Sequence, residues 1–167
     1  MGAYPAGNII RVTPTLSTDA YSDADVLFVS TEVPNIVSSR GGVALLTNLT
    51  VIDKETQTSD WDIHLHENSV SIGTINATVN VSHDNYTDAN LIGMWRIDGD
   101  QGESEDIDNL KVHAAMNLGG GHTRWSPMII KAAEGSTSIY VSGHIVTGTP
   151  TYAADSLQLI FNVQYLG

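Results

Sequence analysis

The chain is built from strand-length segments in which apolar and polar residues alternate, separated by clusters of turn residues. The clearest pair is residues 138–152 and 157–166, which read as two strands joined by a turn containing Gly and Pro. A repeat of two residues suits a pleated strand with one buried face and does not suit a helix, whose repeat is 3.6 residues. This pattern predicts an all-β fold.

The alternation is strict in residues 60–67. Trp61, Ile63 and Leu65 fall on one side of the predicted strand, and the polar residues between them fall on the other. The sequence therefore predicts that the three apolar side chains face a core and that the polar side chains face solvent.

The same reading, applied to the whole chain, gives about nine or ten strands and little helix. The predicted extended segments are residues 8–13, 25–30, 43–52, 60–67, 70–81, 91–97, 109–117 and 125–131, together with the C-terminal pair. One short helix is predicted in residues 82–91, with Ser82 or Asp84 as its N-cap. This spacing predicts a single jelly-roll-like antiparallel β-sandwich with one short helix, formed by residues 9–167 and preceded by a flexible N-terminal arm, residues 1–8.

Composition excludes several classes of function. The 167 residues carry 7 Lys and Arg against 19 Asp and Glu, a formal net charge of -12 that disfavours binding to nucleic acid or to anionic membranes. There is no Cys, which excludes disulfides, thiolate metal sites and cysteine nucleophiles. We also find no signal peptide and no segment long and apolar enough to span a membrane.

Two groups of residues have a spacing that suits metal ions only in part. His64 and His66 share one face of a predicted strand, but no third ligand is recognisable beyond the nearby Asp62 and Glu67. A cluster of carboxylates does not match the spacing of a calcium-binding EF-hand, so we interpret it as a solvated mobile loop; its members are Asp98, Asp100, Glu103, Glu105, Asp106 and Asp108. We therefore expect no metal and no cofactor.

No combination of residues indicates catalysis, because no nucleophile stands with a base and an orienting group. A hydrolase with a carboxylate pair is the least favoured alternative, since nothing selects a pair from nineteen acids. Residues 119–124 lack the context of a phosphate-binding loop and are interpreted as a turn. Trp61 and Trp95 are expected in the core, whereas Trp125 and Tyr86 are the candidates for stacking on a sugar.

Five segments in order carry a resemblance to known proteins: residues 10–27, 49–54, 69–74, 139–141 and 147–152. Together they resemble a group of small virion proteins of tailed bacteriophages, especially aquatic phages. The resemblance spans most of the chain and is weakest over residues 98–108 and 119–124. Residues 153–156 depart from the pattern, because relatives tend to have a Gly before the last strand.

The resemblance implies a capsid cement or decoration protein, folded in the bacterial host cytoplasm and located on the outer capsid surface. It also implies a homotrimer that binds junctions between major capsid proteins, and it transfers no catalytic or ligand-binding residue. We expect the N-terminal arm to reach a neighbouring subunit, because Gly, Ala and Pro carry little intrinsic structure; its residues are Gly2, Ala3, Tyr4, Pro5, Ala6, Gly7 and Asn8. The alternative from another class is a carbohydrate-binding or receptor-binding module that uses Trp125 or Tyr86.

Overall fold

The protein forms eleven strands and one helix within the residues that the structure describes. This structure is a computed structural model, and it describes residues 6–99, 104–114, 116–117 and 127–166. The elements are β1 (Gly7–Val12), β2 (Val26–Val33), β3 (Val43–Asp53), β4 (Asp60–His66), α1 (His83–Asp88), β5 (Leu91–Ile97), β6 (Ser104–Ile107), β7 (Leu110–Ala114), β8 (Met116–Asn117), β9 (Met128–Lys131), β10 (Ile139–Thr147) and β11 (Leu157–Tyr165).

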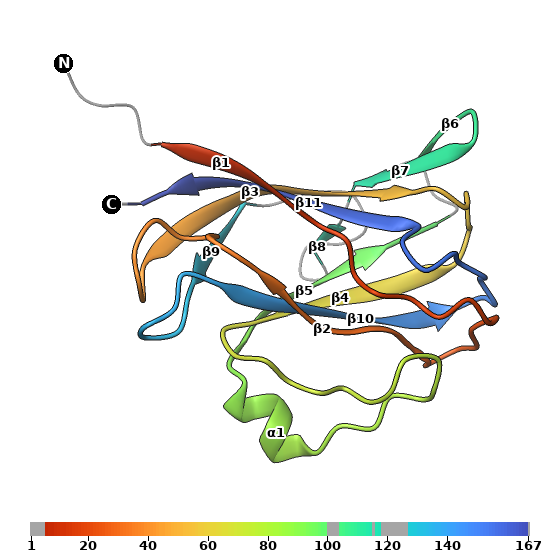
Figure 1. The fold of residues 1–167 in the computed structure, drawn as a ribbon, viewed down its shortest axis with the longest axis horizontal. Helices are drawn as coiled ribbons and strands as arrows, with labels where there is room; N and C mark the ends of the chain where they lie inside the picture. Colours follow the sequence, from red (N-terminus) through yellow and green to blue (C-terminus); the bar gives the residue numbers. More distant parts are fainter. Residues whose placement is uncertain (1–5, 100–103, 115, 118–126, 167) are drawn as a thin grey trace.

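Two antiparallel sheets lie face to face (Figure 1). The six-stranded sheet has the order β1-β11-β3-β7-β6, with β9 beside another part of β3, and the five-stranded sheet has the order β2-β10-β4-β5-β8. The strands form four antiparallel pairs: β1 with β11, β2 with β10, β3 with β7 and β4 with β5. Taken in this order, the four pairs make up one long antiparallel hairpin. The hairpin is rolled so that β11 also pairs with β3 and β10 with β4. This is jelly-roll connectivity, and the predicted fold class is confirmed.

The space between the sheets is filled by the apolar face of each strand. Trp61, Ile63 and Leu65 are buried there, as the alternation in β4 predicts, and Trp95 is buried with them. The ring of Phe28 in β2 meets Trp61 edge-to-face, with 6.3 Å between ring centroids. These side chains come from strands far apart in the sequence, so the core forms only when both sheets are in place.

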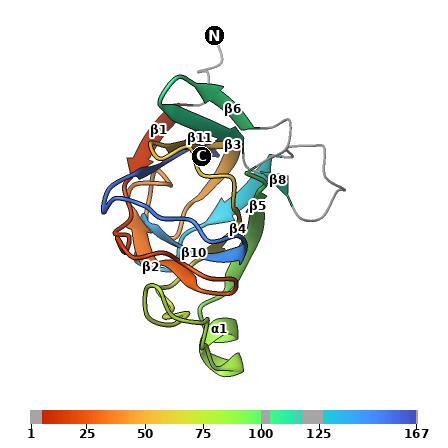
Figure 2. The ribbon, with the colours of Figure 1, turned by 90° about the vertical axis from the view of Figure 1, so that its right-hand side faces the viewer.

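The segment between β4 and β5 differs from the prediction. Residues 70–81 form no strand and contribute only isolated bridges to residues 25 and 26. The short helix is confirmed as α1, and its N-cap is Ser82, whose hydroxyl accepts a hydrogen bond from the backbone N–H of Asn85 at 3.2 Å. Figure 2 shows this segment on the outer side of the five-stranded sheet. Within the described ranges, no helix is long and apolar enough to cross a membrane.

A second apolar cluster explains why this segment lies against the sheet. Val26 on β2 is buried against Val70, Ile72 and Ala89 of the covering segment. The alternating apolar residues of 70–81 therefore meet the outer face of an existing sheet instead of forming a new strand. Burial of each such side chain stabilises the contact by about 1.5–3 kcal/mol.

Three further connections differ from the sequence reading. Residues 104–107, expected in a mobile loop, form β6, which pairs with β7. The predicted strand 109–117 is divided into β7 and β8, which belong to different sheets. The two C-terminal strands are confirmed as β10 and β11, but they too lie in different sheets, so the turn between them crosses the edge of the sandwich.

We predict that Gly143→Ala destabilises the fold. A Cβ at this position of β10 would lie 2.6 Å from Cε1 of Phe28, whose ring is fully buried. The clash should lower the free energy of unfolding by about 1–3 kcal/mol, measured by urea denaturation. Thr147→Ala on the same strand is exposed and is the control, with an expected change within about 0.5 kcal/mol. Equal midpoints for the two variants would contradict the packing described here.

Candidate functional site

The polar face of β4 is buried, not solvated as the sequence predicted. Asp62, His64 and His66 are only 4%, 7% and 1% exposed. The prediction was wrong because the segment between β4 and β5 folds back over this face, and alternation along one strand carries no information about such a cover. The result is a group of ionisable residues between the five-stranded sheet and the segment that contains α1.

Two imidazoles and a phenol form a continuous chain of hydrogen bonds in this group. The hydroxyl of Tyr86 on α1 lies 2.6 Å from Nδ1 of His64, and Nε2 of His64 lies 2.8 Å from Nδ1 of His144 on β10. Each donor has one acceptor if Tyr86 donates to His64 and His64 donates to His144. These hydrogen bonds therefore connect α1 to the adjacent strands β4 and β10.

A salt bridge between Arg96 and Asp62 lies next to the hydrogen bonds of His64. Arg96 on β5 stands directly opposite Asp62, and its Nε and Nη2 donate to the two carboxylate oxygens at 2.8 and 3.0 Å. This hydrogen bonding raises the pKa of Arg96. A bidentate pair satisfies the nearly buried carboxylate of Asp62, which would otherwise be costly to remove from water.

The third imidazole of the cluster has no hydrogen bond. His66 lies parallel to His64, with 6.4 Å between ring centroids, and meets Tyr86 edge-to-face at 4.9 Å. Neither of its ring nitrogens has a hydrogen-bond partner among the described residues. Burial lowers the pKa of both His64 and His66 to about 4 and also lowers the pKa of His144, so the three imidazoles are neutral at pH 7.

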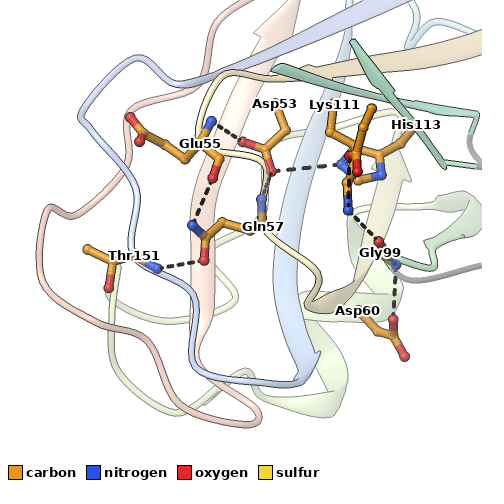
Figure 3. A network of polar contacts seen from close by, with 9 residues as sticks. Asp53, Glu55, Gln57, Asp60, Gly99, Lys111, His113 and Thr151 are labelled. Carbon is orange, nitrogen blue, oxygen red and sulfur yellow. Dashed lines mark hydrogen bonds and ion pairs between the residues drawn. The ribbon is translucent and has the colours of Figure 1, made fainter. Parts of the chain in front are cut away.

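A separate polar network occupies one end of the space between the sheets (Figure 3). Asp53, Lys111 and His113 are each less than 7% exposed. The carboxylate of Asp53 accepts from the backbone N–H groups of residues 55 and 57 at 2.8 and 2.9 Å and lies 3.8 Å from Nε2 of His113. Nζ of Lys111 donates to the carbonyl of Gly99 at 3.0 Å and lies 3.5 Å from Asp106. The network thus holds the β6–β7 hairpin against the loops that follow β3 and β5.

The structure places only some of the residues selected from the sequence. Of the N-terminal arm, Gly7 and Asn8 lie in β1, Ala6 precedes it, and residues 1–5 are outside the described residues. Trp125 and the turn 119–124 are also outside them. Tyr86 is half-buried, and its hydroxyl points to His64, so only part of its ring lines an open pocket of about 620 Å³ beside Glu67 and Leu91.

Among the described residues, these polar side chains connect separate elements of the fold and do not form a nucleophile–base pair. Ser142 lies opposite His64 in the pairing of β10 with β4, yet its hydroxyl has no hydrogen-bond partner in the described part of the chain. Both nitrogens of His64 are already used, so no serine–histidine pair of the kind used for nucleophilic catalysis forms there. Among the described residues, no group of three or more His, Asp or Glu is arranged to hold a metal ion.

The comparisons with known proteins assign no family to this chain. No protein-family model matches it, and no curated protein matches it.

The buried histidines predict a loss of stability in mild acid. The folded-state pKa of His66, about 4, lies below the ordinary value of 6.5, so the unfolded state binds more protons between these two pH values. The contribution of neutral His66 to stability is complete above pH 6.5 and decreases as pH falls toward 4. The free energy of unfolding of the wild-type protein should fall when the pH is lowered from 7 to 4.5. We expect this fall to be smaller by about 1–3 kcal/mol in His66→Phe.

Urea titrations at the two pH values measure this difference directly. His83→Phe is the matched control, because His83 lies on α1 with its side chain 88% exposed. The control should keep the pH dependence of the wild-type protein. If His66→Phe also keeps the wild-type pH dependence, burial of the neutral His66 imidazole is not the cause of the loss of stability in acid.

We also predict that Tyr86→Phe loosens the segment over the five-stranded sheet. The substitution removes the hydroxyl next to Nδ1 of His64 and leaves that buried nitrogen without its partner, at a cost of about 1–3 kcal/mol. Amide hydrogen exchange should become faster in residues 67–90 and stay unchanged in β3 and β11. Tyr140→Phe, a half-buried tyrosine on β10, is the control; equal exchange in the two variants would contradict the role of this hydrogen bond.

Proposed function

We propose that this protein is a structural virion protein, a capsid cement or decoration protein of a tailed bacteriophage. It binds junctions between major capsid proteins on the outer surface of the shell. The proposal is supported by the resemblance of five sequence segments to such proteins and by a jelly-roll body whose ionisable clusters are internal. A protein of this kind needs docking surfaces and needs no catalytic pocket.

The observation that carries the proposal is the position of β1. This strand lies at one edge of the six-stranded sheet, and in the described part of the chain it pairs with β11 alone. Its other edge presents backbone N–H and C=O groups that can accept an added strand from another protein. The remaining arm residues precede this strand in the sequence, so we expect the arm and the free edge of β1 to contact the same neighbouring capsid subunit.

The charge of the chain is compatible with this location. A net charge of -12 disfavours contact with packaged DNA and with membranes, which suits a protein that faces outward. Binding only to the assembled lattice stabilises that lattice by mass action. In a homotrimer, three linked contacts add avidity, so each contact with the major capsid protein can be weak.

We predict that removing residues 2–5 abolishes shell binding without unfolding the protein. β1 begins at Gly7, and the carbonyl of Ala6 accepts a hydrogen bond from the N–H of Tyr165 at 2.9 Å, so the deletion ends before the sandwich begins. The melting temperature should be unchanged. Cosedimentation with phage shells that lack the protein should fall at least about tenfold, a loss of roughly 1.4 kcal/mol or more of binding free energy.

A variant in which residues 2–5 are replaced by four Gly and Ser residues is the control for chain length. It should bind as poorly as the deletion if the arm residues themselves make the contact. Wild-type binding and heat protection by the deletion variant would remove this role of the arm. Failure of the wild-type protein to bind any shell would overturn the proposed function.

A further inference from the structure

The outer face of the six-stranded sheet carries a compact apolar patch. In the register of the sheet, Leu45 on β3 stands opposite Ile129 on β9, and Val43 is hydrogen-bonded through its carbonyl to Leu166. Ile9 on β1 lies farther along the same face, opposite Asn162 of β11, which itself pairs with Asn48 of β3. Ile9, Ile129 and Leu166 are 53%, 65% and 45% exposed. We call these five residues, Ile9, Val43, Leu45, Ile129 and Leu166, the apolar patch.

The part of this face formed by β1, β3, β9 and β11 contains no carboxylate, although the chain has nineteen; on β6, across β7, Glu105 lies on the same face of the sheet. Outward positions on β1, β3, β9 and β11 alternate with the buried positions of the same strands. Besides the apolar patch they hold amides, hydroxyls, further aliphatic side chains and two cations; these residues are Arg11, Asn48, Thr50, Ile52, Lys131, Gln158, Ile160, Asn162 and Gln164. An exposed surface normally mixes both signs of charge, so a sheet face without acids is unusual in this protein.

The two outer faces of the sandwich differ in how they are covered. The five-stranded sheet is covered by the segment that contains α1, which buries a second apolar cluster. Over β1 and the neighbouring ends of β11 and β3, the described residues supply no such cover (Figure 1). Exposed apolar patches rimmed by polar residues mark interaction sites on soluble proteins.

Charge favours another copy of this chain as the occupant. Two copies that each carry -12 repel one another, and carboxylates placed against carboxylates would add to the cost of contact. The face without acids is where two copies can approach with the least repulsion. A basic partner would instead be attracted to the acidic remainder of the surface.

The size of the face is also sufficient. β1, β3, β9 and β11 have 6, 11, 4 and 9 residues, which at about 3.3 Å per residue and about 4.8 Å per strand cover roughly 500 Å². Stable interfaces bury about 800 Å² of accessible surface on each partner, a value that side chains on a flat area of this size approach.

We infer that this chain self-associates through the apolar patch, with the patches of further copies of the chain as its partners. The inference deepens the self-association included in the proposed function by naming the surface that carries it. Apolar side chains from facing sheets would interdigitate, as they do inside a β-sandwich. Contact of this kind is strengthened by salt, because screening reduces the repulsion between the acidic bodies.

Analytical ultracentrifugation of the purified full-length chain tests this inference. Wild-type protein at tens of micromolar should sediment above the monomer mass of 17.9 kDa, more completely in 0.5 M than in 0.05 M NaCl. Ile129→Asp places a carboxylate in the patch and should weaken association at least tenfold. Ile107→Asp is the matched control, because Ile107 is 54% exposed on β6 at the other end of β3, and it should associate like wild type.

Leu166→Asp is a second patch variant, and a melting curve for each variant confirms that it folds. A wild-type protein that is monomeric at both salt concentrations would overturn the inference, as would Ile129→Asp and Leu166→Asp proteins that keep the wild-type mass. Shell binding, measured separately, distinguishes the two proposals. A patch variant that is monomeric and still binds shells supports the patch as the self-association surface, whereas wild-type protein that associates but binds no shell removes only the proposed function.

Discussion

The pairing of β4 with β10 is the constraint on which the rest of the structure depends. They are the central strand of the five-stranded sheet and its neighbour, and their register places Ile63 opposite Gly143 and His64 opposite Ser142. A shift by one residue would exchange the two faces of a strand, moving the apolar side chains out of the core and the histidines into it. The close approach of Phe28 to Gly143 fixes the same register from the neighbouring strand β2. The packing of the core and the histidine cluster formed by His64, His66 and His144 therefore both depend on the register of β4 with β10.

Much of the fold follows from local patterns, and the parts that do not follow depend on contacts between distant segments. Alternation identifies most strands, and Ser82 correctly marks the start of α1, because both signals act within a few residues. Residues 70–81 also alternate, with one break between Ile72 and Ile75, yet their apolar side chains pack against an existing sheet. In β7 the alternation is inverted, with Lys111 and His113 inside and Val112 outside, because the end of the sandwich is filled by a polar network. Of the histidine cluster, the sequence indicates only His64 and His66, since nothing local announces that β10 brings His144 beside them.

The ionisable residues of this protein divide into two populations with different roles. The first population consists of Asp53, Asp62 and the residues that contact them. Asp53 and Asp62 are buried and hydrogen-bonded, and they join separate parts of the chain to one another. Most of the remaining carboxylates are exposed and give the body its negative charge. The sheet face formed by β1, β11, β3 and β9 carries two cations and no carboxylate, which sets it apart physically from the rest of the surface. The structural role that we propose would explain this division, because assembly requires both a rigid body and a region of low repulsion.

The meeting of the first and last strands has a practical consequence for work with this protein. β1 begins where β11 ends, joined by the hydrogen bond from Tyr165 to Ala6, and the apolar patch lies at that same end. An affinity tag or fluorescent label fused before β1 or after β11 would therefore crowd the very region that we assign to assembly. The turn at Asp108 and Asn109, which closes the β6–β7 hairpin, projects from the opposite end of the sandwich (Figure 1). A label inserted there would leave the assembly region accessible.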